Sequence, residues 1–122
     1  MKTFNKTHRD LEVWQRSIQL VTSVYLLSKS LPKDQRFIIG DQLQRSAISI
    51  PSNIAEGACR GSNKEFARFL NIALGSISEL ETQLIICSKL EFFENLHIQE
   101  ELQTIRKMIY GLKRSILSKS RN

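Results

Sequence analysis

Few residues of this 122-residue chain have the types and spacing that catalysis or metal binding requires. Carboxylate-bridged metal sites in helix bundles need a Glu-x-x-His motif on each of two helices and a glutamate on each of the other two. The chain has one such spacing, from Glu94 to His97, and His8 supplies no second copy. We therefore interpret this spacing as chance and expect no metal site.

Other catalytic patterns are also missing from the local sequence. Cys59 and Cys87 stand alone, and in a reducing cytoplasm both are most simply small buried hydrophobic residues. No Ser/His/Asp or Cys/His set is visible, although such residues can converge in space. The glycines of "GACRG", residues 57–61, lack the Lys-Ser/Thr pair that completes a phosphate-binding loop. These observations predict a protein that is not an enzyme and that has no cofactor.

Basic residues are the more informative feature. The formal net charge is +6, from 18 basic and 12 acidic side chains. Residues 1–9 and 102–122 hold half of the basic residues and no acidic one, so residues 10–101 carry a slight negative excess. Concentrated positive charge is expected of a protein that contacts phosphate groups. Basic termini that only keep a small protein soluble are the alternative.

Apolar residues at helical spacing predict the elements that must position these charges. The predicted helices span about residues 10–30, 34–59, 63–90 and 95–118. Pro32 marks the turn before the second helix, and Ser62 with Glu65 makes a capping box before the third. Amphipathic helices with short connections form bundles, so we predict an all-α fold, an antiparallel up-down-up-down four-helix bundle in a single domain of residues 1–122.

This topology predicts one basic end. Both termini and the connection between the second and third helices lie together in such a bundle, and the opposite end leans acidic, with Glu91, Glu94, Glu100 and Glu101. Few aromatic residues lie near the basic segments, which favours contact with nucleic-acid backbones over base stacking. The predicted nucleic-acid-binding residues are Lys2, Lys6, Arg9, Arg60, Lys64, Arg68, Arg106, Lys107, Lys113, Arg114, Lys119 and Arg121.

A polar stripe runs along the second predicted helix. Ser49, Asn53 and Glu56 step by four and three residues, so they share one face beside the apolar positions. Pro51 lies in the same stretch, and because a proline removes one backbone hydrogen bond, we expect a kink near it. Polar groups at a subunit boundary fix register and partner choice, so we interpret the stripe as a subunit interface. Simple exposure to solvent is the alternative.

The third predicted helix supplies the other half of this interface. Antiparallel packing around Gly61 would place Arg45 near Ile77, within reach of Glu79 or Glu81. The predicted interface residues are Arg45, Ser49, Asn53, Glu56, Ser76 and Glu79.

Three stretches carry a family resemblance. "DLEVWQRSIQLV", "RSAISIPSNIAEG" and "FARFLNIALGSISELETQL" resemble the four-helix-bundle family of 23S ribosomal RNA intervening sequence proteins, from about residue 10 to residue 117. That family is itself similar to the accessory variability proteins of diversity-generating retroelements. The resemblance implies a bacterial, non-enzymatic bundle that assembles as a ring-shaped homopentamer and binds nucleic acid. One departure is the turn at Leu90-Glu91-Phe92-Phe93, where relatives often carry a Gly-Tyr pair.

These observations leave three classes of function. An oligomeric protein that binds RNA or DNA is the first, and a scaffold for a partner protein, such as a reverse transcriptase, is the second. A metal or redox bundle is the third, and the missing ligands argue against it. No apolar run approaches the roughly 18 residues of a membrane span, and the N-terminus lacks the apolar core of a signal peptide. We therefore expect a cytoplasmic protein without membrane contact.

Overall fold

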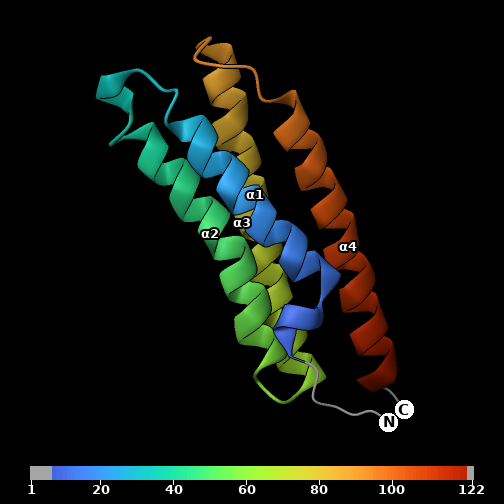
Figure 1. The fold of residues 1–122 in the computed structure, drawn as a ribbon. Coiled ribbons are helices and arrows are strands. Elements are labelled where there is room, and N and C mark those ends of the chain that lie inside the picture. Colours follow the sequence, from blue (N-terminus) through green and yellow to red (C-terminus); the bar gives the residue numbers. More distant parts are fainter. Residues whose placement is uncertain (1–6, 121–122) are drawn as a thin grey trace.

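The four helices of the described chain run alternately up and down along one long axis (Figure 1). The computed structural model describes residues 7–120. It contains two short 3-10 turns, η1 (His8–Asp10) and η2 (Lys33–Gln35), and the helices α1 (Glu12–Ser28), α2 (Ile39–Ala58), α3 (Asn63–Lys89) and α4 (Leu96–Ser120). Helix α1 packs against α2 and α4, and α3 packs against the same two helices. The predicted all-α four-helix bundle is confirmed.

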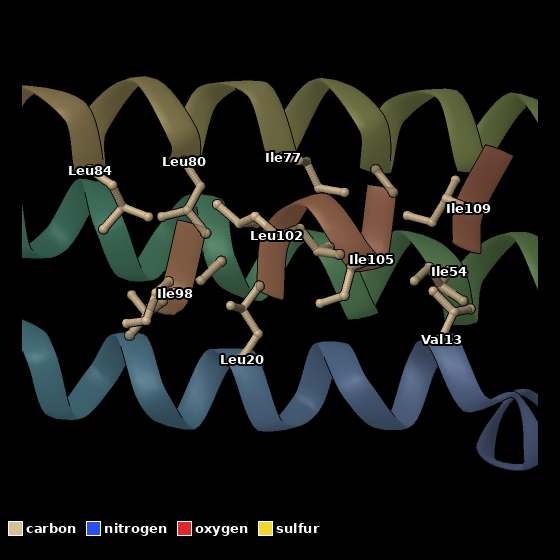
Figure 2. Close-up of a cluster of buried hydrophobic side chains, with 14 of the residues drawn as sticks. Val13, Leu20, Ile54, Ile77, Leu80, Leu84, Ile98, Leu102, Ile105 and Ile109 are labelled. Carbon is tan, nitrogen blue, oxygen red and sulfur yellow. The ribbon is translucent and has the colours of Figure 1, made fainter. Parts of the chain in front are cut away.

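Aliphatic side chains from all four helices point toward one another along the bundle axis (Figure 2). On α3 they recur every three or four residues, as the sequence pattern predicts. Burial of each such side chain stabilises the fold by about 1.5–3 kcal/mol, so this core is the main source of stability. The fully buried members include Leu20, Leu43, Ile50, Ile54, Leu70, Ile77, Leu80, Leu84, Leu102, Ile105 and Ile109.

Helices α2 and α3 lie close together at Gly57. A Cβ atom at this position would lie 2.8 Å from the Cβ of Phe69 and 3.0 Å from a ring carbon of Phe66. No real side chain tolerates the first distance, so glycine is required for the two helices to cross here. The turn that follows uses Gly61 at φ +86°, and Ser62 then caps α3 by accepting a hydrogen bond from the Glu65 amide at 3.1 Å.

The second helix begins later than the sequence predicts. Its expected start at Asp34 is wrong, because Lys33–Gln35 forms only η2 and α2 begins at Ile39. The Gln35 amide donates to the Pro32 carbonyl at 2.8 Å, which closes one tight turn. This turn lets Leu31 stay buried, at 2% exposure, while the chain crosses to the line of α2.

Pro51 lies inside α2, which continues through it without interruption. The proline is buried on the side of α2 that faces α1. Its ring crowds the carbonyl of Ala47, a small residue that is itself fully buried. An uninterrupted helix is compatible with a bend, so the expected kink stays a prediction.

The turn between α3 and α4 places Glu91 at φ 60°, in the left-handed region that favours glycine. The Phe92 amide donates to the Cys87 carbonyl at 3.0 Å, and the Asn95 side chain donates to the Leu84 carbonyl at 2.8 Å. The geometry is thus a normal helix C-terminus with a glutamate at its glycine position.

Within residues 7–120, no helix has the length and hydropathy that crossing a membrane requires.

Candidate nucleic-acid interface

One end of the bundle combines η1, the turn between α2 and α3 with the first turns of α3, and the last turns of α4 (Figure 1). Asn63 links two of these parts, because its side-chain amide donates to the Ile116 carbonyl at 3.0 Å. Lys2, Lys6 and Arg121, which the sequence assigned to this end, lie outside the described residues. We define the basic end as the predicted cations that fall on these parts, namely Arg9, Arg60, Lys64, Arg68, Lys113, Arg114 and Lys119.

Two arginines of the basic end converge on the ring of Phe69. The guanidinium carbons of Arg60 and Arg68 lie 4.8 Å and 4.5 Å from the ring centroid. Arg60 also pairs with Glu56 at 2.8 Å, and Arg68 pairs with Glu65 at 3.2 Å. A guanidinium has five N–H donors, so each arginine keeps donors for a ligand while the ring and the carboxylate hold its direction.

The charge on Glu65 follows from this cluster. Its hydrogen bond from Arg68 is the main cause that lowers the pKa of Glu65 below the usual 4.5, and the charges of Arg68, Arg60 and Lys64 also lower it. Glu65 is therefore ionised at neutral pH. It orients Arg68 and also cancels part of the positive charge around Phe69.

The other cations of the basic end form no ion pair with the described part of the chain. Arg9, Lys64, Arg114 and Lys119 are exposed, and Lys113 is half-buried. Because no carboxylate holds them, they can neutralise phosphate groups without first breaking an ion pair.

Arg106 lies elsewhere, and its predicted place at the basic end is wrong. Its guanidinium pairs with Glu81 of α3 at 3.0 Å and donates to Gln103 and Ser78. At about 1.5 Å of rise per residue, it lies about 10 Å along α4 from Lys113, the nearest residue of the basic end on that helix, and about 20 Å from Lys119. Arg106 therefore links α3 to α4, and its exposed neighbour Lys107 lies about 9 Å along α4 from Lys113.

The predicted contact of Arg45 with Glu79 or Glu81 within one chain is also wrong. One oxygen of Glu81 is held by Arg106, and its second oxygen accepts from Gln103 at 2.6 Å. Arg45 and Glu79 are both exposed, and neither forms an ion pair or side-chain hydrogen bond within residues 7–120. They remain free for a contact outside the chain.

Most of the polar stripe is satisfied inside one subunit. The hydroxyls of Ser49 and Ser76 lie 2.7 Å apart, and the Asn53 amide donates to the Ser49 hydroxyl at 2.9 Å. The carboxylate of Glu56 forms an ion pair with Arg60. A single chain thus has a use for these side chains, contrary to the expectation behind the interface assignment, because they replace apolar contacts along the seam of α2 and α3. Their part in a subunit interface stays a prediction.

The two cysteines differ in their exposure to solvent. Cys87 is buried as expected, and burial raises the pKa of its thiol. Cys59 is exposed at the end of α2, so its expected burial is wrong. In the described part of the chain, no three His, Cys, Asp or Glu side chains come close enough to hold a metal ion.

Sequence reasoning missed the cluster around Phe69. The spacings Glu56 to Arg60 and Glu65 to Arg68, four and three residues, are the signals for ion pairs along a helix. No local signal could show that both arginines would meet over one ring, because that depends on the angle at which α2 turns into α3.

The model of the 23S rRNA-intervening sequence protein family matches residues 9–111. The chain belongs to this family. Among solved structures, a protein with unknown function from the S23 ribosomal protein family of Bacteroides thetaiotaomicron VPI-5482 is similar, with 27% sequence identity and a TM-score of 0.76. The match covers 84% of this chain and 95% of that one. No curated protein matches the chain.

Membership of the 23S rRNA-intervening sequence protein family confirms the family resemblance and the bundle that it implies. The family name does not state an activity, and the similarity to retroelement accessory proteins stays a prediction.

Proposed function

We propose that this family member is a non-enzymatic, oligomeric bundle that binds RNA or DNA backbones through its basic end. The single observation that supports the proposal is the gathering of seven cations on three separate segments at one end of the bundle. Five of them have no carboxylate partner within residues 7–120. Such a surface holds phosphates by releasing counterions, which requires no particular base sequence.

The assembly that we propose is a homopentamer, on the strength of the family resemblance, in the bacterial cytoplasm. In a cyclic ring all subunits point the same way along the axis. Every basic end would then lie on one face of the ring, and the positive charge of one subunit would be repeated around that face.

The test compares two triple variants that remove the same charge. Lys64, Arg114 and Lys119 change to Gln in the first, and Lys29, Lys33 and Lys89 change to Gln in the second, at or toward the opposite end. All six side chains are exposed, and none forms an ion pair within residues 7–120. Affinity for a structured RNA and for duplex DNA is measured over a series of salt concentrations.

The first variant should bind both nucleic acids more weakly and with a shallower salt dependence. The slope should fall by about 0.9 for each duplex phosphate that the variant no longer neutralises. The second variant should bind as the wild type does. Equal affinities for all three proteins would contradict the proposal. The protein would then be better explained as a scaffold for a partner protein, such as a reverse transcriptase.

A further inference from the structure

Helix α2 separates two surfaces that nothing in the described chain covers. The first is a hollow along α1 and α2, which we call the groove. It consists of spaces of about 300 Å³ and 220 Å³ that share Val21 and Ile48. Trp14 and Pro51 line its wider part, and Ile48 is 50% exposed. The groove follows most of the length of α1.

The second surface is a row of residues on the outer side of α3, which we call the ridge: Ile72, Gly75, Glu79 and Ile86. Their spacing of three, four and seven residues keeps them on one helix face. Both isoleucines are more than 40% exposed. Ile86 borders a shallow hollow with Ile38 and Ile39, so the ridge lies toward α2.

Gly75 is the unusual member of the ridge. A glycine in the middle of a helix costs about 1 kcal/mol relative to alanine. The close crossing of α2 and α3 explains Gly57, but a Cβ atom at Gly75 would meet nothing within 4 Å. The chain itself gives no reason for a bare backbone here. Gly111 on α4 is open in the same way but half-buried, whereas Gly75 is exposed, so close approach by another molecule would explain the glycine at position 75.

The free charges fit the same explanation. Arg45 lies on the outward side of α2, between the groove and the ridge, and Glu79 lies on the ridge. Both are exposed and unpaired within the described chain, although they have opposite charge. In an assembly, Glu79 of one copy can form an ion pair with Arg45 of another copy.

We propose that the ridge of one copy docks into the groove of the next, with Glu79 of the first copy beside Arg45 of the second. This inference rests on the oligomer of the proposed function and adds the surfaces that form it. Its partner is a second copy of this chain.

The heights of the residues along the bundle support this docking. A rotation about an axis parallel to the helices leaves every residue at its own height. The contact of Ser49 with Ser76 places Gly75 about two residues, or about 3 Å, from the level of Ile48 and about one residue from that of Pro51, and both of these residues line the groove. From that contact Glu79 lies about 4.5 Å and Arg45 about 6 Å along the axis in the same direction, so their heights agree within about 1.5 Å.

The directions of the two surfaces favour a closed ring. Contact surfaces on opposite sides of a subunit build an open filament, whereas surfaces about 108° apart close a ring of five. The groove is lined by α1 and α2, and the ridge on α3 borders α2 from its other side, so the two surfaces lie on neighbouring sides of the bundle with α2 between them. Repeated docking therefore turns the chain of subunits back on itself.

Disulfide cross-linking tests the docking. A variant with Cys59→Ser, Ile48→Cys and Gly75→Cys is oxidised and run on a non-reducing gel. A disulfide needs Cβ atoms about 3.8 Å apart, and no heavy atom of the same chain lies within 4 Å of a Cβ at position 75. Any cross-link through this position therefore joins two copies.

Gly111 provides the matched control, because a Cβ atom there also meets nothing within 4 Å, and it lies on α4. Gly111→Cys replaces Gly75→Cys in the same background. We expect a ladder of covalent species that ends at the size of the ring, with at least about tenfold more linked chain than in the control.

Sedimentation of the wild type distinguishes a failure of the docking proposal from a failure of the proposed oligomer. If the wild type forms a ring but the variant with Ile48→Cys and Gly75→Cys cross-links no better than the control, the ridge-in-groove contact is wrong. The proposed oligomer is then unaffected. A monomeric wild type at the same concentration overturns the oligomer itself and this inference with it.

Discussion

Among single residues, the arginines of this protein differ in the side chains that they contact. Arg60 and Arg68 are fixed on Phe69 and remain at the basic end. Arg106 is half-buried between α3 and α4 with Glu81. The same side chain thus prepares a surface for a ligand in one place and joins two helices in another, and its partners decide which.

Arg106→Gln should lower the free energy of unfolding by about 1–2 kcal/mol, because it leaves the half-buried carboxylate of Glu81 without its charged partner. Affinity for RNA should stay unchanged, because the guanidinium of Arg106 is already engaged by Glu81, Gln103 and Ser78. Arg114→Gln is the control. It should leave the free energy of unfolding unchanged and weaken the binding of RNA. Urea unfolding and RNA binding of both variants measure these effects, and weaker RNA binding by a fully stable Arg106→Gln protein would contradict the assignment.

The ion pair of Glu81 also predicts a pH dependence. The hydrogen bond from Arg106 is the main cause that lowers the pKa of Glu81 below the usual 4.5. A carboxyl group with a lowered pKa in the folded state stabilises the protein above its unfolded pKa, and this stabilisation disappears as the pH falls through the folded pKa. Stability should therefore decline below about pH 4.5.

Glu81→Gln should remove this part of the acid dependence. Its melting temperature should be lower than that of the wild type at pH 7, and the difference should shrink toward pH 3. A constant difference between the two proteins over that range would show that the ion pair contributes nothing.

Among the helices, α3 was the easiest to predict and the start of α2 the hardest. The periodic apolar residues of α3 fixed its ends to within one residue, because its buried face follows the helical repeat without a break. Pro32 indicated a helix start that became a short turn, because the need to bury Leu31 outweighed the local signal. Phe69 joins two arginines through tertiary packing, and no spacing in the sequence encodes such a contact.

The turn after α3 offers a stabilising change. Glu91 has φ 60°, where a side chain costs about 1–2 kcal/mol relative to glycine. Glu91→Gly should therefore raise the free energy of unfolding by about 1 kcal/mol, after allowance for the greater freedom of glycine in the unfolded chain. Chemical denaturation measures the change.

Gly61→Ala is the opposite control, because Gly61 has φ +86° with open space around it. It should destabilise the protein by about 1 kcal/mol through backbone strain alone. If Glu91→Gly were destabilising instead, the side chain of Glu91 would have to contribute more than its backbone strain costs.

For the whole molecule, charge reversal tests whether Arg45 and Glu79 meet between copies. Arg45→Glu alone and Glu79→Arg alone should each weaken assembly about tenfold or more, because each places like charges together. The double variant should recover much of the affinity, because it restores opposite charges at every contact. Sedimentation over a range of protein concentrations gives the assembly affinities of the three variants. If the loss in the double variant equals the sum of the two single losses, Arg45 and Glu79 do not meet between copies.

The packing of the bundle is unevenly shared among its helices. Helices α2 and α3 form the most extensive contact, whereas α4 packs mainly against α3 and touches α1 less. Elements with few contacts open first, so α4 should separate from α1, its smallest helix contact, before α2 separates from α3 on heating. Such an opening would scatter Lys113, Arg114 and Lys119 but leave the groove and the ridge intact. Warming should therefore release bound nucleic acid from rings that are still closed.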